Sequence, residues 1–186
     1  MSSLANVGTF SKHPRAWGFE HDLRVISGNG SRLVLSDGKE YLDFVSGLGS
    51  NILGYNHPEF IRRVEDQLRR GAGYSLPSFL EDLVADKLVN LLAYKIEGWK
   101  PDNISVRFGK TGSDATSMAV RLARAATGRD VILQAGYAGW GSDFIAATPP
   151  ALGIPQCQKS TIRTFKFNDL DGLANVLDES VAAIII

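Results

Sequence analysis

The segment that most constrains the fold of this chain is 107–124. It begins at the end of a short β-type run, 104–108, and continues through a glycine turn into the start of a helix. Thr111 stands three residues before Asp114, which is the spacing of a capping box. Apolar residues then recur at helical spacing on one stripe: Ala115, Met118, Ala119, Leu122 and Ala126. The segment therefore predicts a strand, a tight turn and a helix over 112–126.

A helix that begins at this turn would offer backbone N–H groups to an anion. If Thr111 caps the helix, the N–H groups of Gly112 and Ser113 have no intrahelical acceptor. The helix dipole adds partial positive charge at the same point, and Gly112 lets a ligand come close to the backbone. Thr111, Gly112 and Ser113 are therefore candidate ligands of a phosphate group. From these residues alone, a purely structural cap remains equally possible.

The turn also has a superficial likeness to a nucleotide-binding P-loop, through Gly109-Lys110-Thr111. That motif requires another glycine five residues before Gly109, and this position is Ile104. The residues between them follow a strand pattern, so the sequence does not favour a nucleotide site. We expect Lys110 to be a surface or interface charge.

From residue 103 onward, strand-like and helix-like segments alternate along the chain. This order is typical of a mostly parallel sheet joined by right-handed crossovers, that is, of an α/β fold. The apolar strands 131–133 and 184–186 are continuous rather than alternating, which suits a sheet covered on both faces. The predicted elements are strand 104–108, helix 112–126, strand 130–134, strand 161–165, helix 169–177 and a final strand at 182–186.

The first part of the chain reads differently. Residues up to about 30 look irregular, and a small β-hairpin is predicted from strands 31–35 and 40–44 around Asp37-Gly38. The glycine-rich stretch 46–56 is expected to be a shaped loop. Helices are predicted to run from Pro58 to a stop at Gly71 and to begin again at Ser78. We therefore expect an N-terminal segment, 1–72, followed by the first part of a larger domain, 73–186.

Composition excludes several classes of function. The formal net charge is +0, so no general attraction to nucleic acid is expected, and no apolar run is long enough to cross a membrane. The N-terminus lacks the basic start and long apolar core of a signal peptide. Cys157 is the single cysteine, which fits a reducing, cytoplasmic location. The three histidines show no metal-ligand spacing, and no metal is expected: His13, His21 and His57.

Several motifs in order resemble class III (fold type I) pyridoxal-phosphate aminotransferases, with glutamate-1-semialdehyde aminomutase-like members the most similar. The resemblance covers the chain from about Phe10 to its end. The family's Ser-Gly-Thr-Glu-Ala-type turn, its Arg-Leu-Ala-Arg helix end and its Gly-Tyr-His-Gly-Trp loop all have counterparts here. The matching segments are Tyr41-Leu-Asp-Phe44, Ile52-Leu-Gly-Tyr-Asn-His-Pro58, Thr111-Gly-Ser-Asp-Ala115, Arg121-Leu-Ala-Arg124, Thr127-Gly-Arg129 and Gly136-Tyr-Ala-Gly-Trp140.

The resemblance implies the cofactor pyridoxal phosphate and a role for individual residues. Gly112 and Ser113 would hold the phosphate by backbone N–H groups and the serine hydroxyl, with Thr111 assisting or only capping. Tyr137 would stack on the pyridine ring, whereas Trp140 is expected to be a packing residue. Asp114 stands where the family commonly has Glu, and Ala138 departs from the usual His. In relatives, the region of Ser46, Ser50 and Asn51 lines the substrate pocket.

The resemblance also implies what this chain does not supply. The family's lysine that forms a Schiff base with the cofactor, and the Asp that pairs with the ring nitrogen, come later than Ile186. We expect the chain to be the front part of a longer, homodimeric enzyme that moves an amino group between a small-molecule amino donor and a carbonyl acceptor. The alternatives are a non-catalytic remnant or split subunit that binds a partner chain, and an unrelated phosphate-binding α/β module.

Overall fold

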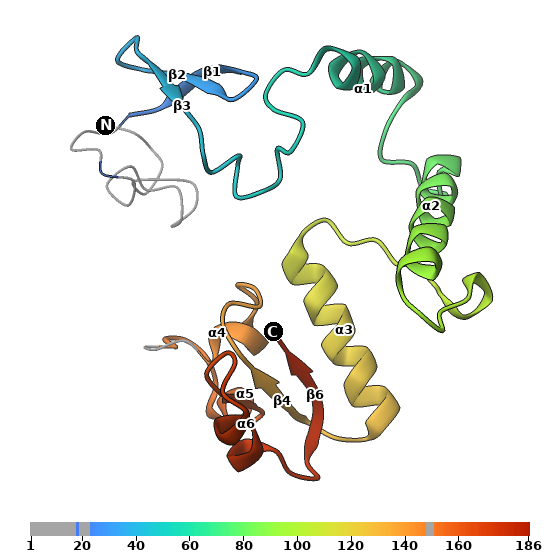
Figure 1. Cartoon of the computed structure of the whole chain (residues 1–186), viewed down its shortest axis with the longest axis vertical. Helices are drawn as coiled ribbons and strands as arrows, with labels where there is room; N and C mark the ends of the chain where they lie inside the picture. The colour runs from blue at the N-terminus through green and yellow to red at the C-terminus, as the bar shows by residue number, and fades with distance from the viewer. Residues whose placement is uncertain (1–17, 19–22, 148–150) are drawn as a thin grey trace. The chain divides into compact units, whose positions relative to one another are not determined.

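The computed structural model describes Gly18, residues 23–147 and residues 151–186. The chain divides into two units, Met1–Ser78 and Phe79–Ile186, and each is described by itself. In the first unit the described residues form a small antiparallel sheet and helix α1 (Pro58–Arg70), and in the second they form a parallel sheet with flanking helices (Figure 1). The predicted mixed α/β class, with a hairpin near the N-terminus, is confirmed.

The sheet of the first unit contains three antiparallel strands in the order β1-β2-β3. The predicted hairpin is present as β2 (Arg32–Leu35) and β3 (Glu40–Leu42), and Gly38 has the left-handed φ of 78° that its turn requires. The expectation of irregular chain up to about residue 30 is wrong for Val25–Asn29, which form β1 and pair with β2, while residues 1–17 and 19–22 lie outside the described residues. Gly28 lies inside β1, where an added Cβ would come within 2.7 Å of the Tyr55 ring.

The same tyrosine closes the glycine-rich loop that follows β3. Its hydroxyl donates to the Asp43 carboxylate at 2.5 Å, and the same carboxylate accepts the N–H groups of Val45 and Ser46. The hydrogen bond between the two side chains holds the pKa of Asp43 below its ordinary value and raises the pKa of Tyr55. The loop is therefore fixed at its base, although Ser46 and Leu48 have left-handed φ values of 49° and 61°.

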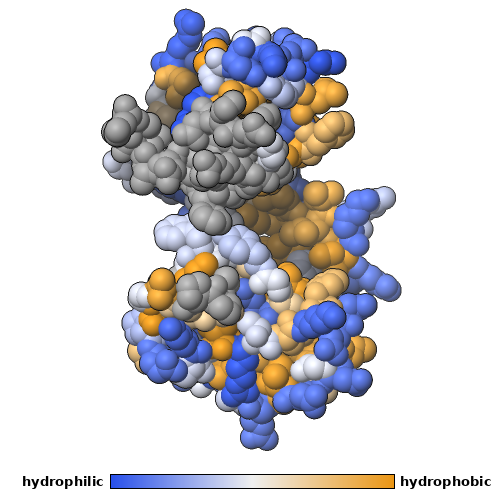
Figure 2. Space-filling model, turned by 90° about the vertical axis from the view of Figure 1, so that its left-hand side faces the viewer, coloured by the Kyte–Doolittle hydropathy of each residue, from blue (hydrophilic) through white to orange (hydrophobic). Residues whose placement is uncertain are grey.

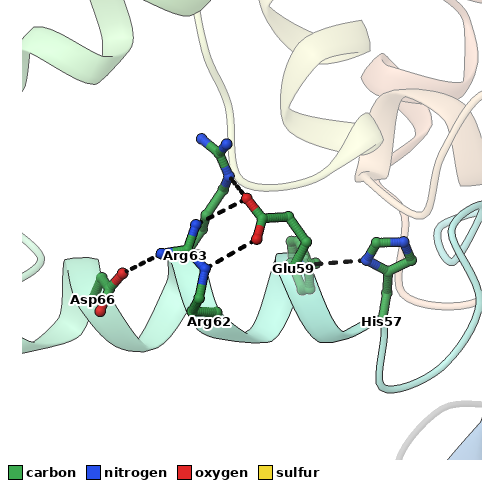
Figure 3. Close-up of polar contacts among 6 residues, drawn as sticks. His57, Glu59, Arg62, Arg63 and Asp66 are labelled. Atoms are coloured by element: carbon green, nitrogen blue, oxygen red, sulfur yellow. Dashed lines mark hydrogen bonds and ion pairs between the residues drawn. The ribbon is translucent and has the colours of Figure 1, made fainter.

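Helix α1 (Pro58–Arg70) begins and ends where the sequence predicts. The His57 ring accepts the Phe60 N–H through Nδ1, and Gly71 follows the last helical residue. On its exposed side the Glu59 carboxylate binds both Arg62 and Arg63, and Arg62 also binds Asp66 (Figure 3). These pairs three and four residues apart form the mixed-charge face of a surface helix.

The second unit begins with α2 (Phe79–Lys95), which is followed by a 3₁₀ turn (Pro101–Asn103) and by α3 (Gly112–Thr127). Its sheet is parallel throughout, with the strand order β5-β4-β6. The remaining elements are β4 (Val131–Gln134), α4 (Ser142–Ile145), α5 (Gln156–Lys159), β5 (Ile162–Thr164), α6 (Leu170–Val176) and β6 (Val181–Ile185).

The central strand β4 is buried along its whole length. Its two faces pack on different helical layers, because successive side chains of a strand point to opposite sides. On one face Ile132 packs with Val120 of α3 and Phe144 of α4. On the other, Leu133 belongs to a cluster against which residues of α6 pack. The sheet is thus covered on both faces, as the continuous apolar strands predicted (Figure 1).

The predicted strand at 104–108 is not formed. Ile104 has extended dihedrals, with φ −113° and ψ 129°, but none of the described strands is hydrogen-bonded to this segment. Apolar alternation makes a segment suited to a sheet, but a strand also requires a neighbour that supplies donors and acceptors. The segment is therefore an extended lead-in to α3.

Large apolar side chains remain exposed in both units, and hydrophobic surface lies among hydrophilic residues on the face drawn in Figure 2. Both α1 and α2 carry exposed apolar side chains. Four of them are at least half exposed: Phe60, Leu68, Leu83 and Leu91. Within the part of the chain that the structure describes, no helix has the length and apolar character needed to span a membrane.

The buried strand generates a prediction about stability. Ile132→Ala should lower the free energy of unfolding of the second unit by about 2–5 kcal/mol, because the fully buried side chain leaves a cavity. The matched control is Ile184→Ala in β6, whose side chain is 45% exposed and whose loss should cost only about 1 kcal/mol. Urea unfolding followed by circular dichroism measures both. Equal losses for the two variants would contradict the assignment of Ile132 to the core.

The charged face of α1 predicts an acid-sensitive helix. Hydrogen bonds from Arg62 and Arg63 lower the pKa of Glu59 from 4.5 to about 2. A lowered pKa means that the folded state binds this proton more weakly than the unfolded chain. The stabilisation is therefore complete above about pH 4.5 and is lost as the pH falls toward 2. Glu59→Gln should remove this part of the acid transition of α1, measured by circular dichroism.

The matched control is Glu65→Gln on the same helix, since Glu65 makes no ion pair among the described residues. Added salt should shrink the difference between wild type and Glu59→Gln, because exposed ion pairs are screened. An acid transition that is the same in both variants would show that the Glu59 pairs do not stabilise α1.

Candidate functional site

The first turn of α3 is closed by the capping box that the sequence predicts. The Thr111 hydroxyl accepts the Asp114 N–H at 3.2 Å, and the Asp114 carboxylate accepts the N–H groups of Thr111 at 2.9 Å and Lys110 at 3.1 Å. The Asp114 side chain is thus used in the cap, and so is the Thr111 oxygen. Lys110 is exposed, in keeping with a surface charge.

The cap leaves free donors at the helix start. Within the described part of the chain, the N–H groups of Gly112 and Ser113 have no protein acceptor. A Cβ added to Gly112 would meet no atom within 4 Å other than those of its own helix turn and chain neighbours, so no other described residue covers this position. Two unpaired donors at the positive end of a 16-residue helix can bind an anionic oxygen.

The loop that follows β4 lies against this helix start. The Trp140 N–H donates to the Ser113 hydroxyl at 3.1 Å, which brings residues far apart in sequence into contact. Gly139 is buried here with φ 140°, and a Cβ at this position would come within 2.8 Å of the Ser113 Oγ. Ser113 keeps its own O–H as a donor for a further acceptor.

The aromatic residues of this loop point outward. Tyr137 is 76% exposed, whereas Ala138 packs against the apolar cluster around Val120 and Phe144. The loop begins at the carboxyl end of a buried parallel strand, the usual position of ligand sites in open α/β sheets. The expectation that Trp140 is a packing residue is wrong for the described structure, in which its side chain is 70% exposed.

The structure therefore brings together the residues singled out in α3 and in the 136–140 loop. Thr111, Gly112 and Ser113 form the helix start, and the loop that carries Tyr137 contacts it through Ser113. Sequence reasoning did not single out Thr116, whose hydroxyl donates to the Ala138 carbonyl at 2.9 Å. It also passed over Gln134, although a polar residue that ends an apolar strand was a visible signal.

The glycine-rich loop of the first unit carries a separate pocket of about 320 Å³. Ser46 and Asn51 line it together with Asp43 and Tyr55. Ser50 is not among its lining residues, and the Ser50 hydroxyl instead donates to the Gly47 carbonyl at 2.8 Å. Two of the three polar residues singled out in this loop therefore face one cavity.

No metal centre is found among residues 23–147 and 151–186, where no three His, Cys, Asp or Glu side chains are clustered. His57 instead accepts a hydrogen bond at the start of α1, while His13 and His21 lie outside the described residues. Cys157 is an exposed free thiol in α5.

The chain matches a known protein family. Residues 19–186 match the model of the family described as aminotransferase class-III. A glutamate-1-semialdehyde 2,1-aminomutase of Desulfatibacillum aliphaticivorans is 31% identical over 160 residues, which covers 80% of this chain.

Solved structures give the same result. A transaminase with PLP bound has a TM-score of 0.75 at 26% identity over 88% of this chain. A glutamate-1-semialdehyde aminomutase from Pseudomonas aeruginosa PAO1 has a TM-score of 0.69 at 26% identity, again over 88%. The chain spans 36% of the Desulfatibacillum relative, and 40% and 37% of these two structures.

The contact between loop and helix generates a stability prediction. Gly139→Ala should destabilise the second unit by about 1–3 kcal/mol, because φ 140° is unfavourable for a side chain and the new Cβ meets the Ser113 hydroxyl. Gly112→Ala is the control, since its position is open and has no left-handed φ. Thermal unfolding compares the two variants. A Gly139→Ala protein as stable as Gly112→Ala would mean that the loop does not pack on α3 in this way.

Proposed function

We propose, from the premise that this chain belongs to the class III aminotransferase family, that it supplies the phosphate grip and one ring-face contact of a pyridoxal-phosphate enzyme. The family's members are pyridoxal-phosphate-dependent aminotransferases and aminomutases, and this is the cofactor of the chain. The observation that carries the proposal is the pair of unpaired N–H groups at Gly112 and Ser113, with the Tyr137 loop against the same helix turn.

The residues of the helix start fit the phosphate of this cofactor. Gly112 and Ser113 would bind its oxygens with their backbone N–H groups, and the absence of a Cβ at Gly112 leaves room for the approach. The Ser113 hydroxyl would donate a further hydrogen bond while accepting one from Trp140. Thr111 would act mainly through its cap, because its hydroxyl already accepts the Asp114 N–H.

Tyr137 supports the second part of the proposal. A flat, exposed aromatic side chain on a loop anchored beside the phosphate turn is suited to cover one face of a planar ring. The position where the family usually has His is Ala138, and its methyl group faces the apolar cluster. This chain would therefore hold the ring by stacking, without a polar side chain from that position.

The cofactor, when bound, supplies an electron sink for the amino-group chemistry. The described residues bind its phosphate and orient its ring, and we assign no catalytic residue to this chain. Lys110 is not assigned as a nucleophile, because it precedes the phosphate turn. The tethering lysine and the partner of the ring nitrogen are proposed to come from outside the 186 residues.

At the level of the whole protein, we propose transfer of an amino group between a small-molecule amino donor and a carbonyl acceptor, in a cytoplasmic homodimer. Similarity to both an aminomutase and a transaminase supports this class of reaction without choosing between them. The division into an N-terminal segment, 1–72, and the first part of the cofactor-binding domain, 73–186, belongs to the same proposal.

The proposal is tested by measuring cofactor binding to the native protein, purified from its source. Titration with pyridoxal phosphate, followed by absorbance, should give saturable binding that borohydride then fixes covalently. Tyr137→Ala should raise the dissociation constant about three- to tenfold, because stacking is lost, whereas Tyr137→Phe retains the ring and should bind like wild type. Failure of the wild-type protein to bind would overturn the proposed function. If Tyr137→Ala and wild type bind pyridoxal phosphate with equal affinity, only the stacking role of Tyr137 is disproved.

A further inference from the structure

The loop that carries Tyr137 is tied down at every second residue. The Gly136 carbonyl accepts the Gln134 side-chain amide at 2.9 Å, and the Ala138 carbonyl accepts the Thr116 hydroxyl at 2.9 Å. The third tie is the Trp140 N–H, which donates to the Ser113 hydroxyl at 3.1 Å. Tyr137 lies between the first two ties. Its backbone is therefore held on both sides, while its side chain is 76% exposed.

Two of these ties come from α3 and one from the strand that the loop leaves. Ser113 and Thr116 are separated by one helical turn, so their hydroxyls lie on the same side of α3. The Thr116 hydroxyl also lies 3.1 Å from the Gly112 carbonyl and 3.2 Å from the Ser113 carbonyl, so its shortest contact is with the loop. The Thr116 hydroxyl therefore bonds to the loop in addition to its contacts within α3.

Gln134 is an unusual residue for this position. It is 2% exposed at the end of β4, its amide nitrogen is used on Gly136, and its Oε1 has no partner among the described residues. A buried, unpaired amide oxygen lowers stability, so packing alone does not explain a glutamine here. Its donor, however, fixes the carbonyl directly before Tyr137.

We propose that Thr116 and Gln134 are positioning residues of the cofactor site, which order the 136–140 loop so that Tyr137 is held at the first turn of α3 before the cofactor binds. This inference rests on the proposed function. An exposed tyrosine on an untied loop would lose loop freedom on stacking, and that loss would weaken binding. Hydrogen bonds that order the loop in advance remove this part of the binding penalty.

The test uses the native protein and two ligands. Pyridoxal phosphate probes the phosphate grip and the ring together, whereas inorganic phosphate, used as a competitor, probes only the helix start. Thr116→Val should raise the dissociation constant for pyridoxal phosphate about two- to tenfold, the range expected for one neutral hydrogen bond, and leave that for phosphate unchanged. Thr116→Ser retains the hydroxyl and should restore binding of the cofactor.

The matched control is Thr127→Val at the other end of α3. The Thr127 hydroxyl donates to the Ala123 carbonyl within the helix at 2.8 Å, so this variant removes a threonine hydroxyl without touching the loop. Its cofactor affinity should equal that of wild type. A loss as large as that of Thr116→Val would overturn the proposal, because it would reflect damage to the helix. The proposal would also fail if Thr116→Val weakened phosphate as much as pyridoxal phosphate.

A double-mutant cycle tests whether Thr116 acts through Tyr137, and a Gln134→Leu variant tests the role of Gln134. If Thr116 acts through Tyr137, the effect of Thr116→Val on the dissociation constant should largely disappear in the Tyr137→Ala background, whereas additive effects would overturn the proposal.

Gln134→Leu removes the unpaired oxygen together with the donor, so it should preserve thermal stability while weakening cofactor binding. If Gln134→Leu binds pyridoxal phosphate with the affinity of wild type, Gln134 is not a positioning residue. Wild-type protein that binds no cofactor would instead overturn the proposed function itself.

Discussion

Complete burial of β4 is the constraint on which the second unit depends. Its side chains alternate between a layer formed by α3 and α4 and a layer formed by α6, so a shift by one residue would move each side chain to the opposite layer and disrupt the packing of both clusters. Fixing the strand also fixes the point where it ends. The loop that leaves it at Gly136 must therefore begin at the carboxyl edge of the sheet, where the first turn of α3 contacts it.

In the candidate site, backbone groups are available to bind a ligand, whereas most polar side chains stabilise the protein. The backbone N–H groups of Gly112 and Ser113 have no acceptor among the described residues, whereas nearby polar side chains mostly make hydrogen bonds within the protein. Asp114 is part of the helix cap, and Thr116 is tied to the loop. Tyr137 and Trp140 carry large, exposed side chains on the loop that contacts this helix start. This arrangement suits a ligand with one anionic group and one flat ring, which are the features of pyridoxal phosphate.

Much of this could be predicted from the sequence wherever the interactions are local. The cap of α3, the steps of its apolar stripe, the turn at Gly38 and the end of α1 all rest on spacings of four residues or fewer. Strand 104–108 was predicted wrongly for the opposite reason. Its pattern suited a strand, but pairing depends on a neighbouring strand, and none of the described strands provides one.

The sequence by itself determined the α/β class and the capped start of α3, because capping and periodicity act over short spacings. It indicated the family through the resemblance of several motifs taken in order. Only the tertiary structure decided that β1 pairs with β2 around Gly28, and that Thr116 and Trp140 join α3 to its loop. These contacts span 22 and 27 residues in the case of the loop, and no local spacing specifies them. They are possible because burial of β4 against α3 and α4 holds the two chain segments close to each other, so that the hydroxyl and backbone groups can pair.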